Sequence, residues 1–191
     1  MPIDLTKLTQ NEDIVEALGM ACDLYFVTDE KDRAEPLWCT VDGASKFLTL
    51  ARDGSGGRFV TVPPSPRVVY ASSEGQGGVI AQSVDEFITM TVACPFWRDV
   101  LKFSDGGRLE ELRRAVPVLE ASWLDDDEDH DIMREFLIEE LDITPPDDIA
   151  AMLYRIVTTR AAMLHADGSA LEPLFGNFTV DRSPALKPYL D

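Results

Sequence analysis

Residues 51–88 read ARDGSGGRFVTVPPSPRVVYASSEGQGGVIAQSVDEFI. This stretch contains three short runs rich in β-branched or aromatic residues, 58–62, 67–71 and 78–82, which glycine, proline, aspartate and serine separate. A parallel return between strands needs a crossover of about a dozen residues or more, and these spacers are shorter. The stretch therefore predicts antiparallel strands that follow one another along a meander.

The same pattern continues toward the N-terminus. Further strand-like runs occupy residues 24–28, 37–41 and 46–51. Before them, Asn11 stands where a helix N-cap is expected, ahead of apolar residues at helical spacing, so we expect a helix over residues 12–20. The first half of the chain thus predicts one N-terminal helix followed by a sheet.

Toward the C-terminus the pattern becomes helical. Ser83 with Glu86 three residues later forms a capping box, which predicts a helix from residue 84 that Pro95 kinks or ends. A second helix is expected from about Leu109, and apolar stripes over 133–141 and 149–163 predict two more.

Strands followed by helices favour an α+β fold with an antiparallel or mixed sheet. The length is that of one domain, and we expect it to cover residues 1–165. Within it, residues 109–165 form an acidic helical extension, and the proline-bearing residues 166–191 are expected to form an extended or loosely docked tail.

Two glycine clusters, at residues 54–57 and 75–78, each lie between strand-like runs. Neither cluster has the lysine and hydroxyl residue of a phosphate-binding loop, and strands rather than helices follow them. Glycine supplies the positive φ that tight connections between strands require, so both clusters are interpreted as hairpin turns.

The chain is strongly acidic. Its 191 residues include 35 acidic and 17 basic side chains, a formal net charge of −18. This balance argues against binding to nucleic acids or anionic membranes, because both require clustered lysine and arginine. Residues 109–150 alone hold 15 acidic and 3 basic side chains, and the run around His130 must be solvated. The run does not fit a calcium loop, since the required glycine and glutamate positions hold other residues.

Little in the sequence indicates catalysis. Cys22, Cys39 and Cys94 are widely spaced and match neither a disulfide framework nor a zinc site, so we expect reduced, partly buried thiols and no metal or cofactor. His130 lies inside the acidic run and His165 near the expected end of a helix, which is typical of helix-terminal or surface histidines. With no secretory signal and no apolar stretch long enough to cross a bilayer, a cytoplasmic location is expected.

Two parts of the quoted stretch resemble the SUKH superfamily, the fold of many bacterial toxin-immunity proteins and fungal cell-wall regulators. The first is ARDGSGGRF at residues 51–59, where a strand runs into an acidic, glycine-bearing turn. The second is VVYASSEGQGGVIAQSVDEFI at 68–88, which ends in the Ser-apolar-acidic-acidic-Phe start of a helix. The chain departs from the family in lacking the early proline-bearing loop and in its long acidic extension. The resemblance implies an α+β domain without an active site that neutralises a toxin, often a nuclease.

These observations lead to one functional hypothesis, a non-enzymatic immunity-type protein that binds a basic toxin through an acidic surface. The residues expected to bind the partner are Asp125, Asp126, Asp127, Glu128, Asp129, Asp131, Glu135 and Glu139. An intracellular scaffold or regulatory module of the same fold is the alternative. If the sheet or its loops bind instead, Arg67, Tyr70 or the turn at Glu74 matters more. An enzyme would require a pocket that brings a histidine against a carboxylate and a nucleophile.

Overall fold

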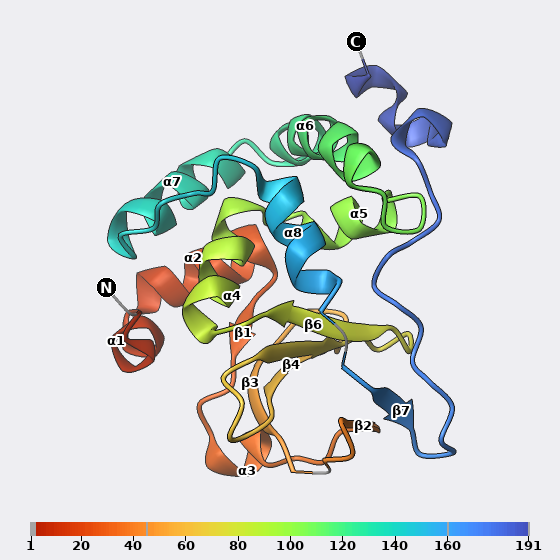
Figure 1. Cartoon of the computed structure of the whole chain (residues 1–191). Helices are drawn as coiled ribbons and strands as arrows, with labels where there is room; N and C mark the ends of the chain where they lie inside the picture. Colours follow the sequence, from red (N-terminus) through yellow and green to blue (C-terminus); the bar gives the residue numbers. More distant parts are fainter. Residues whose placement is uncertain (1–2, 45, 160, 191) are drawn as a thin grey trace.

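A computed structural model describes residues 3–44, 46–159 and 161–190, and it confirms the α+β class. A five-stranded sheet has the order β1-β3-β4-β5-β6, and every neighbouring pair in it is antiparallel. Helices cover the upper face of this sheet in Figure 1, and a small two-stranded sheet lies below it. The strands of the larger sheet are β1 (Tyr25–Phe26), β3 (Leu48–Arg52), β4 (Arg58–Thr61), β5 (Val68–Ala71) and β6 (Gly77–Ala81).

Both glycine clusters lie at hairpin connections, as predicted. Residues 53–57 join β3 to β4, with Gly56 at φ +90°, and Ser72–Gln76 join β5 to β6, with Gly75 at φ +92°. These positive φ values suit glycine because a Cβ atom would strain the backbone there. The second cluster does not belong entirely to the turn, since Gly77 and Gly78 already pair within β6.

Successive side chains along the central strands point to opposite faces of the sheet, so the interior consists of two cores. Phe59, Tyr70 and Ile80 point into the larger core beneath the helices. Their neighbours Val60, Val69 and Val79 point into a smaller core on the opposite face, where they pack with residues of the two-stranded sheet. A sheet buried on both faces explains why β5 is buried along its whole length.

The two-stranded sheet corrects two expectations. The run at 37–41 forms β2 (Cys39–Val41), but β2 pairs with β7 (Met163–His165) and not with the meander. Met163 and His165 were expected on or at the end of a helix, and both lie in β7 instead. This pairing joins residues far apart in the sequence, so local periodicity contains no signal for it.

Three helices pack together near the N-terminus: α1 (Leu5–Gln10), α2 (Glu12–Cys22) and α4 (Val84–Ala93). A fourth short helix, α3 (Glu30–Arg33), packs near β3. Asn11 caps α2, as predicted, and its side chain accepts hydrogen bonds from Asp13 and Ile14. The helix expected over 12–20 is therefore present and slightly longer, whereas α1 and α3 were not predicted.

Ser83 caps α4, because its hydroxyl oxygen accepts a hydrogen bond from the Glu86 amide at 3.1 Å. We expect Ser83→Ala to lower the free energy of unfolding by about 1 kcal/mol, the usual contribution of such a cap. Urea denaturation measures the change, with Ser73→Ala in the exposed β5–β6 turn as the control. An equal effect of both substitutions would contradict this role of the hydroxyl.

The C-terminal half consists mainly of α5 (Trp97–Lys102), α6 (Leu109–Asp126), α7 (His130–Glu140) and α8 (Ile149–Val157). The start of α6 agrees with the prediction, and Leu112, Ala115 and Leu119 form its buried face. Leu137 of α7 and Leu153 of α8 are also buried in the larger core. The helical extension is therefore part of the main core and not an appendage to it.

The C-terminal residues, expected to form an extended or loosely docked tail, run along the surface and pack on it. Chain 166–179 is mostly irregular and runs past the β5–β6 turn and α5 (Figure 1). It then forms two 3-10 helices, η1 (Val180–Arg182) and η2 (Pro184–Tyr189), which pack on α6. Leu171, Val180 and Leu186 are buried, so apolar side chains hold this segment in place.

Candidate functional site

The eight residues expected to bind a partner gather at one end of the molecule, where α6 meets α7. We call this set, Asp125–Asp129, Asp131, Glu135 and Glu139, the acidic corner. Asp125 and Asp126 end α6, the next three residues connect the helices, and the last three lie on α7. Because 131, 135 and 139 are four apart, they share one side of the helix. The structure thus brings the predicted residues together.

An aromatic and basic cluster fixes the angle between α6 and α7. The rings of Trp123 and His130 stack with centroids 4.4 Å apart, and His130 Nδ1 lies 2.7 Å from the Trp123 carbonyl oxygen. The guanidinium of Arg134 lies over the Trp123 ring at 5.3 Å. It also pairs with Glu120 and Asp131. His130 therefore lies at the start of a helix, as predicted, where it supports the corner structurally.

Most of the negative charge in this region is not neutralised. All three arginines of residues 109–150 form ion pairs with carboxylates of the same region: Glu111, Glu120, Asp131 and Asp148. The other eleven carboxylates of the region are in none of the ion pairs found among the described residues. Asp125 accepts a hydrogen bond from the Tyr189 hydroxyl at 2.7 Å, which joins the C-terminal segment to the corner.

An exposed apolar side chain lies within the acidic corner. Ile132 of α7 is 65% exposed. Glu135 lies one turn further along α7 on the same side, and the N-cap residue Asp129 lies one turn before it, so carboxylates flank Ile132 along the helix. An apolar side chain within a charged rim is the arrangement that protein interfaces use, because the rim excludes water from the central contact.

A second feature is a groove of about 770 Å³ between the β5–β6 turn, α5 and residues 172–178. We call residues 172–178 the strap. Hydrogen bonds fix the strap at both ends: Glu172 pairs with Gly75 and Gly77, and Gly176 with Leu101 and Gly106. Tyr70 and Glu74, named above as alternatives to the acidic run, both line the groove. Arg67 does not, and it pairs with Asp42 elsewhere.

A polar network centred on Asp53 lies behind the groove, which Ser55, Tyr70 and Arg98 of this network line, and no sequence pattern predicted it. The side chain of Asp53 has no exposed surface. Its Oδ2 atom accepts hydrogen bonds from the Tyr70 hydroxyl at 2.6 Å and Arg98 Nη1 at 2.7 Å. Its Oδ1 atom accepts from the Ser55 amide and hydroxyl and from the Gly57 amide at 2.8 Å. A Cβ atom on residue 57 would lie 2.5 Å from Asp53 Oδ2, which explains the glycine.

Arg98 of α5 extends this network to the end of α2. Its Nη2 atom donates to Asp23 Oδ2 at 2.6 Å, and Asp23 Oδ1 accepts a hydrogen bond from the Gly54 amide at 2.8 Å. One arginine thus connects two carboxylates that belong to a helix end and a hairpin turn. Asp53 is buried, whereas Arg98 and Asp23 are partly exposed. Hydrogen bonds among these charges fix the relative positions of the elements that carry them.

The protonation states follow from these contacts. Burial raises the pKa of the Asp53 carboxyl, but hydrogen bonds from Tyr70, Ser55 and Gly57 outweigh burial and hold the pKa below its ordinary value. Burial raises the pKa of the Tyr70 hydroxyl, and the bond to Asp53 raises it further. Near neutral pH the network therefore contains an ionised carboxylate and a neutral phenol, with a charged arginine between two aspartates.

The lowered pKa of Asp53 predicts a loss of stability in acid. A carboxyl whose pKa is lower in the folded state stabilises the fold above its unfolded pKa, near 3.9, and this contribution disappears as the pH falls through the folded value. We expect the stability difference between the wild type and Asp53→Asn to be largest near pH 7 and to shrink below about pH 4. Urea denaturation across this range measures it, and a constant difference would contradict the assignment.

Other chemistry finds little support among the described residues. No group of three or more histidine, cysteine or carboxylate side chains there is arranged to hold a metal ion. None of the described helices combines the length and the apolar character needed to cross a membrane. Cys22, Cys39 and Cys94 are free and buried, as expected, and burial raises the pKa of Cys22 to about 12. Neither histidine is among the described residues that line the groove.

Comparison of the chain with protein families, curated proteins and solved structures finds no significant match. The features that bear on function are therefore the acidic corner, the groove and the polar network behind the groove.

Proposed function

We propose that this chain is a non-enzymatic, cytoplasmic immunity-type protein that binds and neutralises a basic protein toxin through the acidic corner. The observation that carries the proposal is the local charge: eleven carboxylates of residues 109–150 have no arginine or lysine partner among the described ion pairs. The resemblance of residues 51–59 and 68–88 to the SUKH superfamily supports the same function.

The charge of the corner suits a partner that acts on nucleic acid. A nuclease must bind phosphates and therefore carries a cleft rich in lysine and arginine. An acidic protein that occupies such a cleft blocks access to the substrate, and opposite charges accelerate the encounter. Ile132, exposed among the carboxylates, offers an apolar contact once the two surfaces meet.

The position of the carboxylates favours binding over chemistry. Catalytic carboxylates converge on a cavity that excludes water, whereas those of the corner lie along the outer sides of α6 and α7. None of the eight residues is among those that line the groove. The aromatic cluster of Trp123, His130 and Arg134 keeps the corner rigid, which lowers the entropy lost on binding.

The test begins with the protein encoded beside the gene for this chain. We expect the two purified proteins to bind in calorimetry, and co-expression of this chain to restore growth of cells that the neighbouring protein poisons. Binding to a neighbouring protein that poisons nothing would favour the scaffold alternative. Absence of both binding and protection would refute the proposal.

A further inference from the structure

We propose that the groove beneath the strap receives an extended segment of the basic partner, with two cationic side chains separated by apolar ones. This inference takes the class of ligand from the proposed function. The groove itself is a separate surface, since it shares no residue with the acidic corner.

The groove is acidic both beside the β5–β6 turn and on α5. Glu74 lies in the β5–β6 turn, and Glu172 lies beside it because its backbone pairs with Gly75 and Gly77. Asp99 lines the groove from α5. All three side chains belong to exposed residues, and none is in an ion pair found among the described residues. Three carboxylates, two beside the turn and one on α5, therefore face solvent.

The basic groups of the groove do not neutralise these carboxylates. The guanidinium of Arg98 is already paired with Asp23 and Asp53. The ammonium group of Lys102 lies 5.7 Å from the centre of the Phe103 ring, and Lys102 is the other cation in the lining. Three exposed carboxylates against one lysine favour a positively charged occupant.

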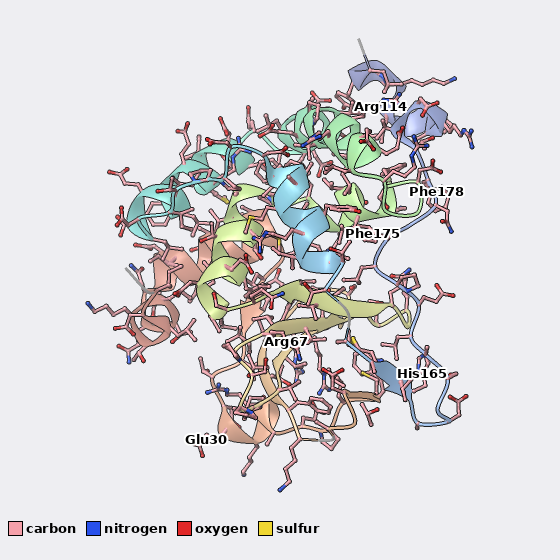
Figure 2. All side chains as sticks on the ribbon, viewed as in Figure 1. Glu30, Arg67, Arg114, His165, Phe175 and Phe178 are labelled. Atoms are coloured by element: carbon pink, nitrogen blue, oxygen red, sulfur yellow. The ribbon has the colours of Figure 1, made fainter. Side chains whose placement is uncertain are left out.

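The middle of the groove is apolar and aromatic. Leu101 and Trp97 line it from α5, and Leu174, Phe175 and Phe178 line it from the strap. Figure 2 shows Phe175 and Phe178 along the strap, and Phe178 is 60% exposed. An exposed aromatic ring in a groove that also carries exposed carboxylates suits a guanidinium, which can stack on a ring and pair with an acid.

The strap also sets the length of the occupant. It crosses from Glu172 at the turn to Gly176 at α5 in four residues, which extend to about 14 Å at most. An extended peptide of four or five residues covers the same distance. The occupant is therefore a short segment in which basic residues flank an apolar pair.

A blocked peptide, acetyl-Arg-Leu-Leu-Arg-amide, tests this proposal by calorimetry with the full chain. We expect the variant Glu74→Gln, Asp99→Asn, Glu172→Gln to weaken binding roughly tenfold or more, because the two arginines of the peptide lose the three carboxylates that attract them. The matched control, Asp29→Asn, Glu30→Gln, Asp32→Asn, removes the same charge from α3 and its N-cap residue, none of which lines the groove. It should change the affinity less than about twofold.

A substitution that is expected to tighten peptide binding shows whether misfolding explains the weaker binding of the groove variant. Lys102→Gln removes the cation that opposes the ligand, so it should tighten peptide binding by about two- to threefold. A peptide with serines in place of the leucines should bind several-fold more weakly, because the apolar middle is unused. Equal weakening by the groove and α3 variants, or no binding of the peptide, would overturn the proposal.

The failure of this inference can be separated from that of the proposed function. If the neighbouring protein binds and the groove variant does not alter its affinity, the groove proposal is wrong and the proposed function stands. If the peptide binds as expected and no neighbouring protein binds, the groove proposal stands and the proposed function is wrong.

Discussion

Asp53→Ala should lower the free energy of unfolding by about 3–5 kcal/mol, the range found when one partner of a buried ion pair is removed. The Asp53 side chain is fully buried and accepts five hydrogen bonds. Its loss leaves the Tyr70 hydroxyl and the Gly57 amide without an acceptor and removes a counter-charge from Arg98. For a domain whose total stability is about 5–15 kcal/mol, this is a large fraction.

Urea denaturation at neutral pH measures this loss. The control is Arg108→Ala, which breaks an exposed pair with Asp105, where the arginine side chain is 59% exposed. An exposed pair of this kind contributes between about 0 and 1 kcal/mol, so the control should change stability little. A loss from Asp53→Ala no larger than that of the control would show that the network does not hold the turn, α2 and α5 together.

Neutralising part of the acidic corner should slow association with the basic partner by roughly tenfold or more, with a smaller effect on dissociation. The variant Asp126→Asn, Glu128→Gln, Glu135→Gln changes exposed side chains and leaves the Asp131 and Asp125 contacts intact. The α3 variant described above is the matched control, since Glu30 lies at the opposite end of the molecule in Figure 2. It removes the same charge.

Stopped-flow mixing with the neighbouring protein measures the association rates. Overall charge attraction would slow both variants equally, whereas a specific acidic surface slows mainly the corner variant. Equal rates for both variants and the wild type would mean that the corner does not contact the partner.

Local patterns were sufficient for most of the fold. Short runs rich in β-branched or aromatic residues, separated by turn residues, predicted the strands of the meander, and Asn11 and Ser83 marked the starts of two helices. The charge of the acidic run alone predicted that it is solvated, and residues 125–129 are indeed exposed. These features depend on neighbours in the sequence, which a single chain displays directly.

Features that depend on contacts between residues far apart in the sequence could not be predicted from local patterns. The partner of β2 is β7, more than a hundred residues later, and the register of β7 is set by that pairing. Asp53, Tyr70 and Arg98 come from a turn, a strand and a helix, and each residue alone is unremarkable in the sequence. The one local sign was the run of glycines after Asp53, since Gly57 leaves room for the carboxylate and the phenol.

If the acidic corner recognises a cationic protein, as proposed, association with that protein must depend on salt. The rate constant for binding to the neighbouring protein should be measured between about 0.01 and 1 M salt, where the Debye length falls from about 30 to 3 Å. The wild type should slow steeply with added salt, and the corner variant should show a clearly shallower dependence. Parallel curves for the two proteins, or a wild-type rate insensitive to salt, would contradict the account.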